Sequence, residues 1–156
     1  MTGVELAGGA VLAAIGGVGA YLDIGTRRLP NWLCLIGLLA GAGFSMIDGG
    51  WSLALMALLH ALVALLVGMG LFAMRWIGGG DAKFYAALAA WFPFQAGLSL
   101  LVTVSLTGLL LLIAWLPYRR RLMRADGGLA KSSDFRKLPY GVAIAGGAVL
   151  AFLMQN

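Results

Sequence analysis

Long apolar runs, separated only by short polar or glycine-containing segments, constrain this chain more than any other feature. A membrane-spanning helix needs about 20 mostly apolar residues, with shorter and longer cases known. The runs that meet or approach this length cover residues 4–22, 31–47, 51–77, 82–95, 98–116 and 138–154. The pattern therefore predicts an all-α fold, a polytopic transmembrane bundle of about six helices. We expect residues 1–156 to form a single integral-membrane domain.

Composition agrees with this fold class. Apolar residues make up 62% of the chain and charged residues only 11%, a balance that suits lipid-facing helices and not a soluble domain. The single cysteine, Cys34, excludes an internal disulfide framework and a cysteine-based zinc site. We expect neither a cofactor nor a metal. The net charge of +5 is more typical of membrane topology and contact with anionic lipids than of nucleic-acid binding.

The basic residues predict how the chain is threaded. With six alternating spans and an outer N-terminus, the inner segments are residues 23–30, 75–83 and 117–137. These segments hold two, two and seven basic residues, which are all eleven in the chain: Arg27, Arg28, Arg75, Lys83, Arg119, Arg120, Arg121, Arg124, Lys131, Arg136 and Lys137. Positive residues in short loops mark the cytoplasmic side. Both termini should therefore lie outside, in the periplasm, with the chain in the bacterial inner membrane.

Tryptophans are expected at the two membrane interfaces, where their amphipathic rings are enriched. Trp32, Trp76 and Trp115 fall at the inner ends of the predicted spans, and Trp51 and Trp91 fall at the outer ends.

Two features within the spans are assigned first to helix packing. Gly37 and Gly41 have the GxxxG spacing that allows helices to approach closely in lipid. His60, the only histidine, lies in the middle of the third predicted span. An interhelical hydrogen bond is its simpler role, although a buried histidine in a membrane can also serve function.

Two carboxylates are candidates for chemistry. Asp23 ends the first predicted helix and Asp81 opens the fourth, both at the inner boundary. If they meet, they cannot both ionise cheaply, so one acts as a general base on water and the other as a general acid. Two structural alternatives remain: Asp23 could pair with Arg27 four residues later, and Asp81 could simply cap its helix.

Three motifs resemble those of a known family. Residues 78–83 read GGGDAK, similar to the GxGD signature of intramembrane aspartic proteases. Residues 23–31 read DIGTRRLPN and residues 138–144 read LPYGVAI, and both resemble segments of the type IV prepilin peptidases. The three motifs occur in family order and reach from residue 23 to residue 144, so the resemblance extends over nearly the whole chain.

The resemblance implies an aspartyl endopeptidase that removes the short basic leader of a prepilin at the cytoplasmic face of the membrane. Asp23 and Asp81 would be the catalytic pair. The residues that could contact the substrate are Gly78, Gly79, Gly80, Lys83 and Asn31. Lys83 is a plausible partner for an acidic residue just after the cut.

One departure from the family pattern matters. Longer members carry paired CxxC motifs that bind zinc, and they also methylate the new N-terminus, whereas this sequence has one cysteine. The sequence thus resembles a short form, limited to peptidase activity, of the kind paired with tight-adherence pilins. Two other classes of function stay open: a proton- or cation-coupled transporter subunit that uses the same two acids, and a non-catalytic secretion assembly factor. The oligomeric state is not predicted.

Overall fold

The computed structural model describes residues 2–125 and 138–155, and it describes side chains in residues 2–117 and 138–155. Within these ranges the chain forms helices and no strand. The first helix, α1, covers Gly3–Thr26 and begins with a capping box between Thr2 and Glu5. Its C-cap, Arg27, adopts a left-handed conformation with φ of 54°. These caps satisfy backbone groups that the helix itself leaves unpaired.

The second helix, α2, covers the 43 residues Asn31–Ala73 and reverses direction at Gly50. As one straight rod it would be about 65 Å long, about twice the thickness of a bilayer's hydrocarbon core. Gly50 has φ of 70° and ψ of −164°, a region that is open essentially only to glycine. It breaks α2 into two arms, residues 31–49 and 51–73. This reversal falls in residues 48–50, an Asp-Gly-Gly sequence typical of turns that separates the second and third predicted spans.

Three further α-helices and one short 3-10 helix complete the described fold. Helix α3 covers only Gly79–Ala89, and the short 3-10 helix η1 covers Phe94–Ala96. Helix α4 covers Gly97–Ala125, and α5 covers Tyr140–Gln155. Three stretches are long and apolar enough to cross a membrane: Gly3–Thr26, Asn31–Ala73 and Phe94–Pro117. The described chain is therefore a helical membrane bundle.

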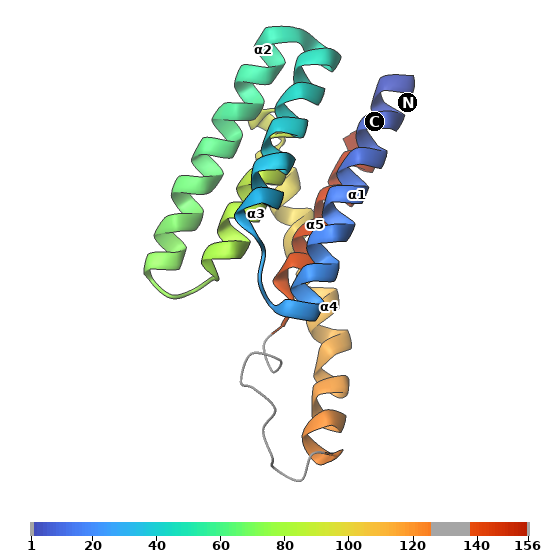
Figure 1. Ribbon diagram of the computed structural model, residues 1–156, viewed down its shortest axis with the longest axis vertical. Helices are drawn as coiled ribbons and strands as arrows, with labels where there is room; N and C mark the ends of the chain where they lie inside the picture. Colours follow the sequence, from blue (N-terminus) through green and yellow to red (C-terminus); the bar gives the residue numbers. More distant parts are fainter. Residues whose placement is uncertain (1, 126–137, 156) are drawn as a thin grey trace.

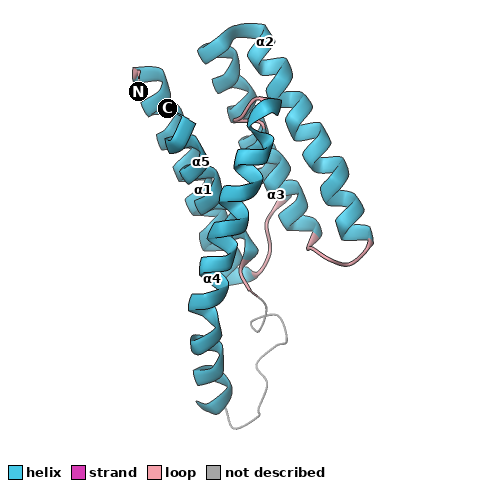
Figure 2. Ribbon diagram, turned by 180° about the vertical axis from the view of Figure 1, so that it is seen from behind, coloured by secondary structure: helices cyan, strands magenta, loops and turns pink. Residues whose placement is uncertain are grey.

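The helices pack as two groups joined through α3. The two arms of α2 lie beside α3, while α1, α5 and α4 lie together on the other side (Figures 1 and 2). The start of α1 and the end of α5 lie at one end of the molecule (Figure 1). The end of α1, the start of α3 and the start of α5 lie together at the opposite end of these helices, and α4 extends beyond them (Figure 1). We call this second end the lower end, as it appears in Figure 1.

Small residues bring these helices into close contact. A side chain at Gly41 would collide with Trp91 and with the backbone of Ala90, and one at Gly37 would touch Ala87 of α3. The GxxxG prediction is confirmed: both glycines lie where the first arm of α2 packs against α3 and the turn after it. On the other side of the molecule, Gly16 of α1 packs against Ala145 of α5.

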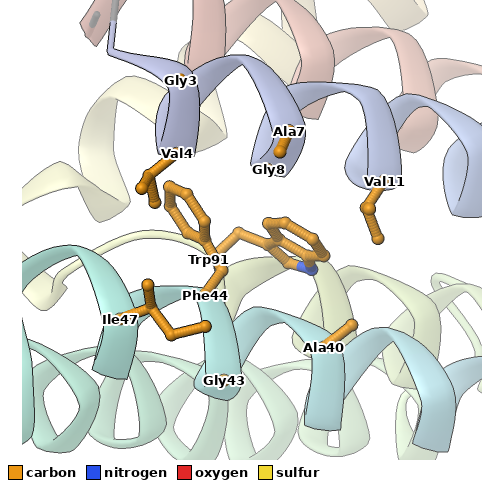
Figure 3. Close-up of a pocket in the computed structure, with 10 residues that line it drawn as sticks. All are labelled: Gly3, Val4, Ala7, Gly8, Val11, Ala40, Gly43, Phe44, Ile47 and Trp91. Atoms are coloured by element: carbon orange, nitrogen blue, oxygen red, sulfur yellow. The ribbon is translucent and has the colours of Figure 1, made fainter.

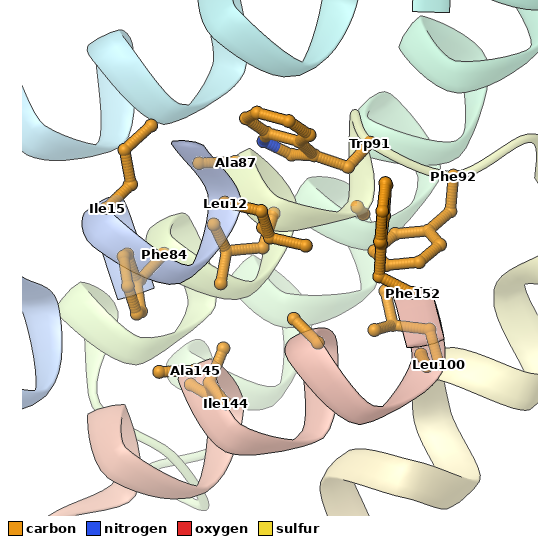
Figure 4. Packing of buried hydrophobic residues seen from close by; sticks show 14 of the residues in the cluster. Leu12, Ile15, Phe84, Ala87, Trp91, Phe92, Leu100, Ile144, Ala145 and Phe152 are labelled. Atoms are coloured by element: carbon orange, nitrogen blue, oxygen red, sulfur yellow. The ribbon is translucent and has the colours of Figure 1, made fainter. Parts of the chain in front are cut away.

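Aromatic and aliphatic side chains from α1, α3, the turn after α3 and α5 form most of the core, and Leu33 and Cys34 of α2 and Leu100 of α4 complete it (Figure 4). Phe84 and Phe92 are fully buried, and Trp91 is only 3% exposed. The prediction that Trp91 belongs to an interfacial belt is therefore wrong. Its ring stacks on Phe44, and its indole N–H donates to the carbonyl of Gly37, so the side chain serves packing. Trp32, Trp51 and Trp76 are exposed, as an interfacial location requires.

Several predicted boundaries need correction. The third predicted span was expected to reach residue 77, but α2 ends at Ala73. Two residues later, Arg75 adopts a φ of 62°, which is not helical. The fourth was expected at residues 82–95, but α3 begins at Gly79 and ends at Ala89. Pro93 accounts for the early end, because it lacks an N–H and disfavours helical geometry in the residue before it.

The fifth predicted span was expected to stop at Pro117, but α4 continues through it to Ala125. A proline removes a single hydrogen-bond donor from the helix. The following arginines, leucine and methionine are good helix formers, so the helix is able to continue. The third inner segment was predicted at residues 117–137. Within it, the side chains of residues 118–125 and the whole of residues 126–137, with Asp126 and Asp134, lie outside the described residues.

Candidate functional site

Asp23 lies in the last turn of α1 and is buried, with only 7% of its surface exposed. Its Oδ2 accepts a hydrogen bond of 2.8 Å from the backbone N–H of Gly141, the second residue of α5. A buried carboxylate needs such a donor, because burial alone makes the charged form costly. Asp23 is thus held by a helix that is 118 positions away in the sequence.

Asp81 is the third residue of α3, and Gly78 is the N-cap of that helix. The alternative that Asp81 is itself the N-cap is therefore wrong. Its carboxylate instead reaches back to the backbone N–H of Gly78. A side chain at Gly78 would lie 2.7 Å from Oδ2 of Asp81, so the missing side chain leaves room for the carboxylate.

The two carboxylates influence each other electrostatically. Asp81 lies outside the three stretches that are long and apolar enough to cross a membrane. Burial raises the pKa of Asp81 to about 6, and the negative charge of Asp23 raises it further in the same direction, while the hydrogen bond from Gly78 opposes the rise. A carboxyl with such a pKa is poised to hold or release a proton near neutral pH.

A single packing contact brings the two acids to the same level. The ring of Phe84 on α3 fills the space beside Gly19 of α1. Asp23 follows Gly19 by four residues, and Asp81 precedes Phe84 by three, so each acid lies one helical turn from this contact. Because α1 descends and α3 ascends in Figure 1, both turns lead toward the lower end. The fold therefore places Asp23 and Asp81 on the same side of the Gly19–Phe84 contact, toward the lower end.

The other predicted site residues also lie at this end. Nζ of Lys83 donates to Oδ1 of Asn31 at 3.1 Å, which joins α3 to the first residue of α2. Both side chains are exposed. Gly80 packs against Leu29 in the connection between α1 and α2, and Gly79 lies against Phe72 at the end of α2. The glycines thus bring α3 close to both neighbouring segments.

Arg27 interacts with α4 as well as with its own helix. Its Cζ lies 5.6 Å from the centroid of the Trp115 ring, within the range of a cation–π interaction. Its charge also acts on Asp23. The charge of Arg27 therefore acts on Asp23 alongside the hydrogen bond from Gly141, and the predicted ion pair between Asp23 and Arg27 stays a prediction.

His60 does not belong to this group. It is 5% exposed, and its Nδ1 lies 3.1 Å from the carbonyl oxygen of Phe92, beyond the C-terminal end of α3. Asp81 lies at the N-terminal end of the same helix. The prediction that His60 makes a packing hydrogen bond is confirmed, but the partner lies in the turn after α3 and not in a second helix. Within the described residues, no three His, Cys, Asp or Glu side chains are grouped so that they could hold a metal ion.

An apolar cavity of about 500 Å³ opens between α1 and the first arm of α2 (Figure 3). It is lined by residues such as Val4, Val11, Phe44 and Trp91 and by no titratable side chain. The cavity lies toward the start of α1, whereas Asp23 is near its end. It therefore adds no chemical group to the acidic pair.

Two contacts at the site could not be predicted from the sequence. The residues involved, Gly141, Lys83 and Asn31, stand in motifs that the sequence analysis identified. Their positions were therefore visible, but the hydrogen bonds that join them to distant segments depend on the fold.

Comparison with known proteins identifies one family. The model of the type IV leader peptidase family matches residues 10–113, a range that contains both acids. A prepilin leader peptidase/N-methyltransferase from Pectobacterium carotovorum subsp. carotovorum is 28% identical over 167 aligned residues. The alignment covers all of this chain and 54% of that protein, so the chain spans about half the length of this curated relative. No solved structure matches the chain significantly.

Proposed function

We propose, because this chain belongs to the type IV leader peptidase family, that it is an intramembrane aspartyl endopeptidase that removes the basic leader from prepilins. One observation carries the aspartic mechanism. Asp23 from α1 and Asp81 from α3 lie one turn from the same Gly19–Phe84 contact, and the charge of Asp23 acts on Asp81. Paired carboxylates of this kind are the machinery of aspartic proteases.

The proposed reaction is hydrolysis of one peptide bond. The ionised carboxylate of the pair takes a proton from a water molecule, whose oxygen attacks the scissile carbonyl carbon. The protonated carboxyl donates its proton to the carbonyl oxygen. As the tetrahedral intermediate collapses and the C–N bond breaks, the carboxyl that took the proton from water gives it to the leaving nitrogen. The other carboxylate regains a proton from a hydroxyl of the intermediate, so the pair returns to its starting state. The pair needs no cofactor, and we propose none.

The distribution of basic residues supports a proposed orientation of the chain in the membrane. All eleven basic residues fall in the segments predicted to be inside, and the acidic pair lies at the boundary of two of these segments. We therefore propose six spans, with both termini in the periplasm and the acids at the cytoplasmic face of the inner membrane. The placement of the start of α1 and the end of α5 at one end of the molecule supports an even number of spans. In this arrangement the basic segments contact anionic lipids, and residues 1–156 act as one domain.

Substrate contacts are proposed around the start of α3. The glycines at positions 78–80 keep the backbone open to an extended peptide. Lys83 is exposed, and it could exchange its hydrogen bond with Asn31 for an acidic group of the substrate. The curated relative is named for a methyltransferase as well as a peptidase. With a single cysteine, this sequence lacks paired CxxC motifs, so we propose the peptidase activity alone.

The decisive experiment removes each acid in turn. The chain is co-expressed with a prepilin, and the precursor and the mature form are separated by gel mobility. Asp23→Asn and Asp81→Asn should each reduce cleavage by about three orders of magnitude or more, and the double variant should be scarcely worse, because the acids act as a unit. Asp48→Asn, at the exposed turn of α2, is the matched control and should cleave normally. If either single variant matures pilin at close to the normal rate, the transporter or assembly-factor function becomes the better explanation.

A further inference from the structure

The first turn of α5 lies against the end of α1 that carries Asp23. Tyr140 and Gly141 are the first two residues of α5, so the N–H of Gly141 has no acceptor within its own helix. It donates instead to Oδ2 of Asp23 at 2.8 Å. The N-terminus of a helix also carries partial positive charge, which favours a negatively charged group placed there. The contact thus combines a hydrogen bond with a favourable dipole.

Position 141 leaves no space for a side chain. A Cβ built there would lie 2.9 Å from Cβ of Asp23 and 3.0 Å from its Oδ2. The Cβ atom of Asp23 is fixed to the α1 backbone, so it cannot swing aside as the tip of a long side chain can. Any residue larger than glycine must therefore push the start of α5 away from the Asp23 carboxylate.

We propose that Gly141 is a positioning residue for the cleavage reaction, whose backbone N–H fixes one oxygen of Asp23 and leaves the other for the water shared with Asp81. This inference rests on the proposed function, because it assigns a role within that reaction. Gly141 lies beyond residues 10–113, the range matched by the family model. The contact therefore comes from the tertiary structure alone.

A positioning role predicts a change in pH dependence. The charged groups that act together with Asp23 are Asp81 on α3 and Arg27 on α1. The hydrogen bond from Gly141 stabilises the ionised form of Asp23. We therefore assign Asp23 as the base of the proposed pair and Asp81 as the acid. When the bond is lost, the base becomes protonated at a higher pH, so the acidic limb of the kcat/KM profile moves upward. A purely structural defect lowers the amount of folded enzyme and leaves the limb in place.

The test compares Gly141→Ala with Gly17→Ala, a substitution of the same kind on α1. A Cβ at Gly17 would meet nothing within 4 Å. Cleavage of a prepilin is measured in proteoliposomes over the pH range in which the wild type is stable. For Gly141→Ala we expect kcat to fall about tenfold or more, KM to stay nearly constant, and the acidic limb to rise by about one pH unit. Gly17→Ala should match the wild type in all three.

A second protein removes the donor without adding any atom to a side chain. In a semisynthetic chain, an ester replaces the peptide bond between Tyr140 and Gly141, so the N–H is lost. This N–H has no partner within the helix, so the only change to the helix's own hydrogen bonds is that the ester carbonyl of residue 140 is a weaker acceptor. The acidic limb of the kcat/KM profile should move upward in the ester protein as in Gly141→Ala. If Gly141→Ala does not fold, the ester protein alone tests the positioning role. An unchanged limb and kcat in the folded ester protein overturn the inference.

The two proposals can fail separately. If Asp23→Asn abolishes cleavage while the Gly141 proteins behave as the wild type, the proposed function stands and only the positioning role is wrong. If Asp23→Asn cleaves normally, the aspartyl mechanism fails, and the role of Gly141 fails with it.

Discussion

The indole N–H of Trp91 donates a hydrogen bond of 3.0 Å to the carbonyl oxygen of Gly37, which joins the turn after α3 to the first arm of α2. Gly41, one turn further along α2, leaves room for the same indole ring. Ser45 continues this line of contacts, since its hydroxyl donates to the carbonyl of Ala90 at 3.3 Å. The first arm of α2 therefore holds the C-terminal end of the helix whose N-terminal turn carries Asp81.

Gly41→Ala should destabilise the protein. The added Cβ would lie 2.6 Å from Cδ1 of Trp91 and 2.9 Å from the backbone C of Ala90, so the end of α3 must shift. Overpacking of this kind costs about 1–3 kcal/mol. Thermal unfolding in detergent micelles measures the loss. Gly43→Ala, on the same arm but with nothing within 4 Å of the new methyl group, is the control. Equal midpoints for the two variants would contradict this account of the packing.

His60→Ala should reduce stability but not the cleavage rate of the folded protein. Without the imidazole, the buried carbonyl of Phe92 loses a hydrogen-bond partner, at a cost of about 1–3 kcal/mol. Asp81, the proposed catalytic residue, lies at the N-terminal end of α3, whereas Phe92 lies beyond its C-terminal end, so the chemistry should be preserved. Unfolding curves and kcat are measured side by side, with Leu59→Ala, at an exposed neighbouring position, as the control. A folded His60→Ala protein that cleaves poorly would assign the histidine to the reaction.

The pKa of Asp81 should fall when Asp23 loses its charge. The negative charge of Asp23 disfavours ionisation of Asp81, so Asp23→Asn removes one cause of the raised pKa of about 6. Burial, the larger cause, remains, and the pKa should therefore stay above the ordinary value of 3.8. Titration of ¹³C-labelled aspartate carboxyls by NMR follows the change. Asp48→Asn should leave the titration of Asp81 where it was. A pKa of Asp81 that is unaffected by Asp23→Asn would show that the acids are not coupled.

The proposed topology can be tested by cysteine labelling. Cys34 is replaced by alanine, and single cysteines are introduced at Thr2, Asp48 and Ser132. In intact cells, an impermeant maleimide should label positions 2 and 48 and should reach position 132 only after the membrane is opened. If only position 132 is labelled in intact cells, the chain has the opposite orientation to the one proposed.

Much of the fold follows from local patterns. Residues 4–22 and 138–154 were predicted as helices, and α1 and α5 lie close to these limits. The reversal at Gly50 followed from the Asp-Gly-Gly turn signal. Boundaries near prolines were less predictable, because a proline can either end a helix, as near Pro93, or remain within one, as at Pro117. The outcome depends on the packing and the helix propensity of the flanking residues.

Local sequence was enough to identify Asp23 and Asp81 as the candidate acids, because carboxylates are costly at the edge of an apolar span and their motifs are contiguous in the chain. The local sequence could not show that the two carboxyls lie at the same level of the fold. Their proximity depends on the contact of Gly19 with Phe84, and the orientation of Asp23 depends on the N–H of Gly141, a residue 118 positions away. Hydropathy and charge decide which segments enter the membrane, since both act on each segment separately. Which side chains then meet is decided only when helices pack, because van der Waals contact and hydrogen-bond geometry are properties of pairs.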